Sequence, residues 1–134
     1  MGAVKRLAAS ALLFLLIAAC GSSPAPGTYS TGGDPGDDPC ARVVSAIGYA
    51  GLLLEPEGRE DAQDFEDAVI GRLAEVHGIT RQFGPRLPDS LAAAVRTVES
   101  TTADLSKAQV PRERQVALLK RYRTAAGQIE AGCR

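Results

Sequence analysis

The sequence predicts an all-α protein, an antiparallel four-helix bundle closed by a disulfide between its first and last helices. Apolar residues recur at steps of three and four in four segments after residue 38, which is typical of amphipathic helices. No segment shows the alternating β-branched pattern of a strand. The joints between the four segments are short, which favours antiparallel neighbours. The bundle is expected to occupy residues 39–134.

The first two helices have clear start and stop signals. Asp38 is a good N-cap, and Pro39 suits the first helical position, where no hydrogen-bond donor is missed. Pro56 ends this helix. The second helix is expected to open at Glu60, because carboxylates suit a helix N-terminus, and to stop at Gly84. The apolar stripes of these helices are Cys40, Val43, Val44, Ile47, Ala50, Gly51 and Leu54 in the first, and Phe65, Val69, Leu73, Val76, Ile79 and Phe83 in the second.

Prolines also mark the third and fourth helices. The third is expected to start around Pro88, and the fourth has Pro111 in its first turn. The joint between them, residues 107–110, is very short. Their stripes are Leu91, Ala94, Val95, Val98, Thr102 and Leu105 in the third, and Leu118, Leu119, Tyr122, Ala125, Ala126, Ile129 and Cys133 in the fourth.

The first 20 residues have the layout of an export signal. Lys5 and Arg6 form a positive start, and the apolar run over residues 7–19 is too short to cross a bilayer as a mature helix. The small residues directly before Cys20 resemble the lipobox of bacterial lipoproteins. This resemblance covers residues 1–20 only. It implies that a signal peptide, residues 1–19, is removed, and that Cys20 becomes an acylated first residue carrying fatty acid such as palmitate. The protein would then be anchored to the cell membrane on its extracytoplasmic side.

Acylation of Cys20 leaves Cys40 and Cys133 as an even pair in an exported chain. A disulfide is the default for such a pair in an oxidising compartment, and two free buried thiols are the alternative. Helix topology supports the bridge independently, because an even number of antiparallel helices returns the chain to the end where it started. Both cysteines also fall on the apolar face of their own helix.

The segment between the anchor and the bundle, residues 20–38, is dense in Gly, Pro and Ser and has no apolar periodicity, which predicts a flexible linker. Of the 15 basic residues only Lys5 and Arg6 lie before Cys20, whereas all 16 acidic residues follow it, so the chain from Cys20 onward has a formal charge of −3. That balance argues against a nucleic-acid partner, since nucleic-acid binders usually show a strong basic excess.

No constellation of residues points to catalysis or to a metal. His77 is the only histidine, and no Ser or Cys nucleophile lies at a spacing that would pair with it, which favours a surface or boundary position. The seven carboxylates from Glu55 to Asp67 lack the spacing of a calcium loop, and no Cys-x-x-Cys pair suggests zinc. Solvation and the helix dipole explain the carboxylates better. We therefore expect no cofactor, no metal and no enzymatic activity.

The fourth helix has the opposite charge bias. Arg112, Lys120 and Arg123 lie with Arg134 in one polar stripe beside the core face, and they predict a docking surface for anionic headgroups, cell-wall polymers or an acidic partner. In the alternative interpretation this stripe pairs with the acidic opening of the second helix, at the same end of the bundle. Basic stripes on solvated helices are common, which favours the alternative.

The sequence thus predicts a non-enzymatic cell-envelope lipoprotein, held to the membrane at Cys20, that acts through contacts with an envelope protein or an anionic envelope polymer. One alternative is a binder of a small apolar ligand or lipid between the helices, since small core residues could leave a cavity. A hydrolase would need a nucleophile and base pair around His77.

The anchor can be tested directly. The variant Cys20→Ser should lose labelling by radioactive fatty acid and leave the membrane fraction, because no acyl chain can be attached to the serine. A variant that stays membrane-bound through detergent-free washes would show that residues 7–19 act as an uncleaved anchor.

Overall fold

Four α-helices and three short 3₁₀ turns account for most of the described chain. The computed structural model describes residues 36–134, so the expected signal peptide, Cys20 and most of the linker lie outside the described residues. No strand occurs within residues 36–134, and the all-α prediction is confirmed. In chain order the elements are α1 (Pro39–Gly51), η1 (Glu60–Ala62), α2 (Asp67–Phe83), η2 (Gly84–Arg86), η3 (Asp89–Leu91), α3 (Ala92–Leu105) and α4 (Arg112–Gly132).

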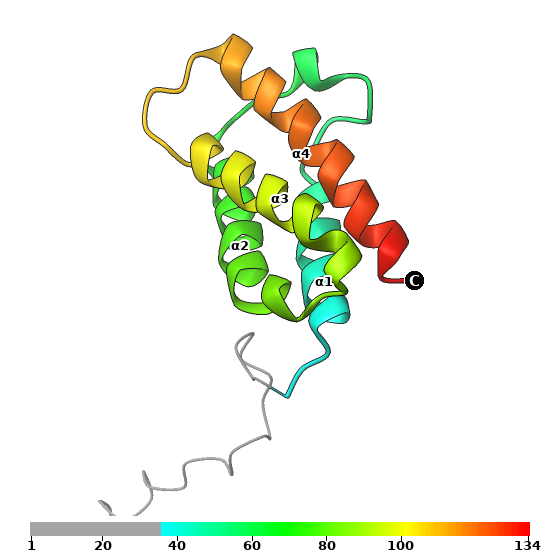
Figure 1. Cartoon of the computed structure of the whole chain (residues 1–134). Coiled ribbons are helices and arrows are strands. Elements are labelled where there is room, and N and C mark those ends of the chain that lie inside the picture. Colours follow the sequence, from blue (N-terminus) through cyan, green and yellow to red (C-terminus); the bar gives the residue numbers. More distant parts are fainter. Residues whose placement is uncertain (1–35) are drawn as a thin grey trace, which may run out of the picture. The chain divides into compact units, whose positions relative to one another are not determined.

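The helices form an antiparallel bundle in which each helix packs against the next one along the chain (Figure 1). The pairs α1 with α2, α2 with α3, and α3 with α4 are all in extensive contact. In contrast, α1 and α4 touch each other sparsely. The chain therefore returns α4 to the side of α1 but leaves the seam between these two helices thinly packed.

The core lies between the helices and takes residues from all four predicted stripes. Val43 of α1, Leu73 of α2, Val98 of α3, and Leu119 and Ile129 of α4 are completely buried. Burying a side chain of this size contributes about 1.5–3 kcal/mol to folding. Since the predicted apolar stripes supply these residues, the 3.6-residue period identified the core faces correctly.

Two glycines bring elements closer than any side chain would allow. A Cβ atom built on Gly84, at the end of α2, would lie 2.7 Å from Cγ1 of Val95 on α3. One built on Gly132, in the last turn of α4, would lie 2.6 Å from Cδ2 of Leu91. A side chain at either position would force the neighbouring valine or leucine side chain to move, so glycine suits the internal packing here.

The start of α1 is as predicted, but the predicted start of the second helix is wrong. The Asp38 carboxylate caps α1 by accepting a hydrogen bond of 2.7 Å from the Ala41 amide. The second helix begins at Asp67 rather than Glu60, and residues 60–62 form the separate turn η1. The Gln63 side chain favours this break, because it donates at 2.7 Å to the Asp64 carbonyl, which a helix from Glu60 would pair with its own backbone. Its oxygen also accepts from the Glu55 amide at 2.7 Å, which holds Gln63 in the loop.

The disulfide between Cys40 and Cys133 is present and joins the first turn of α1 to the residue that caps α4. The two Cα atoms are 5.4 Å apart across a sequence separation of 93 residues. The topological argument from the sequence is therefore confirmed. The bond also supplies a covalent connection between two neighbouring helices that contact each other only sparsely.

Removing the disulfide should lower stability without removing the fold. A loop of this length restricts the unfolded chain by about 4–5 kcal/mol in the loop-entropy model. We therefore expect the variant Cys40→Ala, Cys133→Ala to melt at a clearly lower temperature while keeping its far-ultraviolet helical spectrum at 25 °C. Mass spectrometry of the parent under non-reducing conditions should recover one peptide pair joining these cysteines, and recovery of both as free thiols would contradict the bridge.

Candidate functional site

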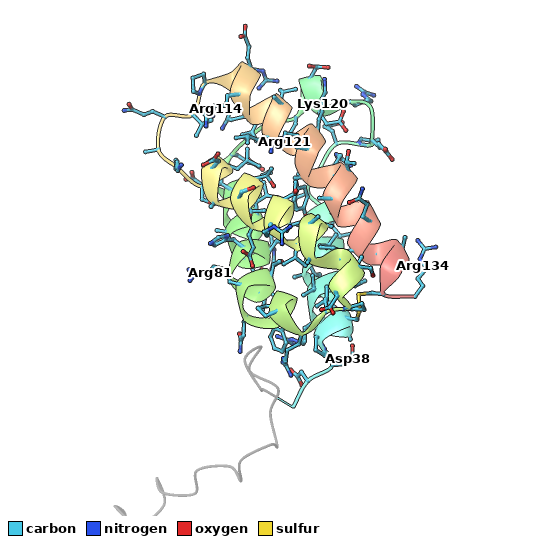
Figure 2. The ribbon with its side chains drawn as sticks, viewed as in Figure 1. Asp38, Arg81, Arg114, Lys120, Arg121 and Arg134 are labelled. Atoms are coloured by element: carbon cyan, nitrogen blue, oxygen red, sulfur yellow. A yellow bond between two sulfur atoms is a disulfide. The ribbon has the colours of Figure 1, made fainter. Side chains whose placement is uncertain are left out.

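The three cations predicted to form a docking surface converge on the segment between α1 and α2, residues 52–66, here called the α1–α2 loop. Arg112 donates a hydrogen bond of 2.8 Å to the Asp61 carbonyl. The Lys120 ammonium lies 3.3 Å from the Asp61 carboxylate. Arg123 donates to the Glu55 carbonyl, and its Nε lies 3.1 Å from a Glu60 carboxylate oxygen. Figure 2 labels Lys120 on the part of α4 that stands beside the η1 turn.

Arg123 and Glu60 are the buried members of this set. The Glu60 side chain is 5% exposed and that of Arg123 20%, whereas Lys120 and Asp61 are largely in solvent. Backbone N–H groups, above all those of Glu60 and Gly58, and the nearby Arg123 and Lys120 charges hold the pKa of Glu60 below its ordinary value of 4.5. Glu60 is therefore a carboxylate at neutral pH, and it neutralises the guanidinium that faces it.

These contacts favour the structural interpretation of the α4 cations over the docking interpretation. This preference is strongest for Arg123, because an external anion would have to compete with the buried Glu60 carboxylate that faces it. The pairing was predicted with the opening of the second helix, but it is made with the loop before it. Arg112, Lys120 and Arg123 therefore fasten the α1–α2 loop to α4.

His77 connects α2 to α3 and is half-buried, as its boundary position predicted. Its Nδ1 lies 3.1 Å from the Glu99 carbonyl oxygen, which can only accept, so Nδ1 carries the proton. The Thr102 hydroxyl lies 3.4 Å from the same nitrogen but donates to the Val98 carbonyl at 2.7 Å. A protonated nitrogen cannot take a proton from that hydroxyl, so the contact lacks the geometry of a nucleophile and base pair.

The carboxylates of residues 55–67 do not form a single cluster. Only Glu66 and Asp67 lie at the N-terminus of α2, whereas Glu60 and Asp61 face α4. In residues 36–134, no three His, Cys, Asp or Glu side chains come together as a metal site would require. Among the helices of this same region, none has the length and apolar character needed to cross a membrane.

A groove of about 390 Å³ runs along the thinly packed seam between α1 and α4. A cavity left by small residues between the helices was part of the alternative prediction, but its position between α1 and α4 was not predicted. Its walls combine apolar side chains with three glycines, and carboxylates stand at its edge. Its lining includes Ile47, Gly48 and Gly51 of α1, Glu57 of the α1–α2 loop, and Tyr122, Arg123, Gly127 and Glu130 of α4.

Tyr122 forms part of the groove and carries an unsatisfied polar group. The residue is 2% exposed, and its hydroxyl has no hydrogen-bond partner among the described residues. Burial, with a further contribution from the Glu130 charge, raises the pKa of this phenol. Leaving a buried hydroxyl unpaired costs about 1–3 kcal/mol, so this group is an exception within the core.

An apolar patch adjoins the groove at the end of α1. Tyr49, Leu52 and Leu53 are 59%, 79% and 42% exposed, and they are the large apolar side chains that the described chain leaves in solvent. Residues three and four apart share a helix face, so Tyr49 lies beside both leucines, and Leu52 lies one turn beyond Gly48 of the groove. The Leu53 amide donates to the Ala50 carbonyl at 3.0 Å, which continues the helical turn and fixes the patch in place.

Comparison with known proteins gives no further assignment, because no family model, curated protein or solved structure matches the chain. The candidate site therefore depends on the geometry alone. It consists of the groove between α1 and α4 and the Tyr49–Leu52–Leu53 patch beside it.

The ion pair of Glu60 should make stability depend on pH in a defined direction. Because the pKa of Glu60 is lowered by folding, the unfolded chain takes up this proton first, and the contribution is present above 4.5 and lost as pH falls through the lowered value. The variant Glu60→Gln should be less stable than the parent at about pH 7, and the difference should shrink toward about pH 3. Urea unfolding at both pH values measures it, with the exposed Glu113→Gln as the control. A difference independent of pH would contradict the assigned role of the Glu60 carboxylate.

Proposed function

We propose that the chain is a non-enzymatic, lipid-anchored protein of the cell envelope whose helical bundle binds another protein. The acylated Cys20 holds the protein at the membrane surface, and residues 20–38 act as its tether. The bundle, closed by its disulfide, presents a preformed surface on α1. The observation that carries this proposal is the exposed Tyr49–Leu52–Leu53 patch at the edge of the groove.

The patch supports protein binding because its apolar side chains are exposed to water in the free protein, and burying them in an interface would be favourable. Fully burying one leucine contributes about 1.5–3 kcal/mol, and Tyr is enriched in the energetically dominant parts of interfaces. Scattered apolar residues are ordinary on protein surfaces, but three that adjoin one another beside a groove are typical of an interaction site. An ordered helical turn also loses little conformational entropy on binding.

A protein partner is better supported than an anionic envelope polymer. A polymer of that kind needs freely available cations, and each of the three α4 cations proposed for it already contacts the α1–α2 loop. The patch and groove instead combine apolar surface with carboxylates, which suits a polypeptide with apolar and basic side chains.

The groove also supports a second candidate, a small apolar ligand or lipid held between α1 and α4. Its volume of about 390 Å³ lies within the range of small-molecule sites. Mass spectrometry of solvent extracts of the purified protein separates the two candidates, because a lipid binder should carry a stoichiometric apolar molecule out of the envelope.

Site-specific photocrosslinking in intact cells tests the protein-binding proposal. A photoreactive amino acid at Leu52 should capture one identifiable protein, and the same amino acid at Arg81, on the outer face of α2, serves as the control. Replacing Tyr49 and Leu52 by Ser should change the free energy of unfolding by no more than about 0.5 kcal/mol at each exposed site and should weaken binding of the purified partner at least about tenfold. Undiminished binding by this variant would refute the proposal.

A further inference from the structure

We propose that the groove between α1 and α4 receives a basic α-helix of the partner protein, with small side chains on the face that enters the groove. This inference rests on the proposed function and deepens it, because it assigns the chemistry of the partner segment. Three observations support it: the open glycines, the charge of the groove, and its shape and length.

The glycines of the groove have no packing role within the bundle. Cβ atoms built on Gly48, Gly51 and Gly127 would meet nothing within 4 Å, unlike those built on Gly84 and Gly132. Gly71 and Gly78 of α2 are equally open, so openness alone does not mark a site. The three groove glycines differ from these because they come from two helices and line the same groove, where together they allow a third backbone to approach closely.

The groove has a negative charge that the bundle does not neutralise. Glu57 and Glu130 both line it, and neither forms an ion pair with another described residue. The cation that lines it, Arg123, is held by Glu60 and the Glu55 carbonyl. Cationic side chains at both ends of a docked segment would complement these carboxylates, whereas the carboxylate of a fatty acid would be repelled by them.

The shape and chemistry of the walls favour a helix over an extended segment. Both walls are helices whose backbone groups are already paired, so an extended peptide in the groove would leave its own amides and carbonyls without partners. A helix brings its backbone hydrogen bonds with it. On α4 the first and last of the lining positions Arg123, Gly127 and Glu130 are seven positions apart, or roughly 10 Å, which matches about two helical turns of a partner.

A designed peptide provides the probe. It is a helical peptide of about 16 residues with Ala and Ser on one face and Lys at both flanks, labelled with a fluorophore, and a Lys→Glu version with the same small face is its matched partner. Fluorescence anisotropy with the purified full chain, its disulfide intact, should show binding of the Lys peptide at least about tenfold tighter than of the Glu peptide.

Two pairs of variants locate the binding. Gly48→Leu with Gly127→Leu fills the groove and should weaken binding of the Lys peptide more than about tenfold, whereas Gly71→Leu with Gly78→Leu, at the equally open glycines of α2, should leave it unchanged. Neither pair should lower the melting temperature, because leucine favours a helix more than glycine does. Glu57→Gln with Glu130→Gln should weaken binding severalfold, whereas Glu113→Gln with Asp89→Asn, which removes the same charge elsewhere, should not.

Each result has a defined consequence for the two proposals. Equal binding by the groove-filled variant and by its α2 control overturns the groove as the site. Equal binding of the Lys and Glu peptides overturns the basic partner. Dimerisation of the chain that is lost in the groove-filled variant would assign the groove to a second copy instead. Photocrosslinking from Leu52 is measured separately in each case. That experiment tests the proposed function, whereas the peptide-binding experiment tests only the groove and its basic helix.

Discussion

The bond between Cys40 and Cys133 determines how α1 and α4 can lie relative to each other. These two helices have little packing between them, so their separation is not set by interdigitating side chains as it is elsewhere in the bundle. The disulfide fixes one end of the seam. At the other end, Arg123 of α4 binds the Glu55 carbonyl and the Glu60 carboxylate of the α1–α2 loop. The two helices are thus held together at both ends of the seam but pack sparsely between these ends, and the space left there is the groove.

The α1–α2 loop can serve as the second attachment because its own polar groups are paired internally. Gln63 is 3% exposed and bonds the Glu55 amide, and Glu60 accepts from the Gly58 amide at 3.1 Å. Gly58 has a φ of 86°, in the left-handed region that glycine adopts without strain, and this conformation brings its amide toward Glu60. The loop is thus an ordered support for α4 and for the patch that precedes it.

The fold was largely predictable from the sequence, because it depends on periodic patterns. The apolar stripes of residues 43–50 and 118–129 repeat at the helical period, and the Asp38-Pro39 pair is a local signal that needs no tertiary context. The α1–α2 loop was not predictable in this way. Whether Glu60 caps a helix or pairs with Arg123 depends on a contact between residues more than 60 positions apart in the sequence, and the local preference for carboxylates at a helix start gave the wrong answer.

The candidate site was less predictable still, for a physical reason. Gly48 and Gly127 look the same in the sequence as Gly84 and Gly132, and all four could be assigned to close packing. Only the structure separates them, because Gly84 and Gly132 meet side chains at 2.7 and 2.6 Å while Gly48 and Gly127 meet none. Similarly, Leu52 is an ordinary apolar residue in the sequence, and only the structure shows that it is 79% exposed. The bundle obtains its stability from the faces of α2, α3 and α4 and the inner face of α1. The outer face of α1 contributes little to that stability, and its residues are therefore free to be selected for binding.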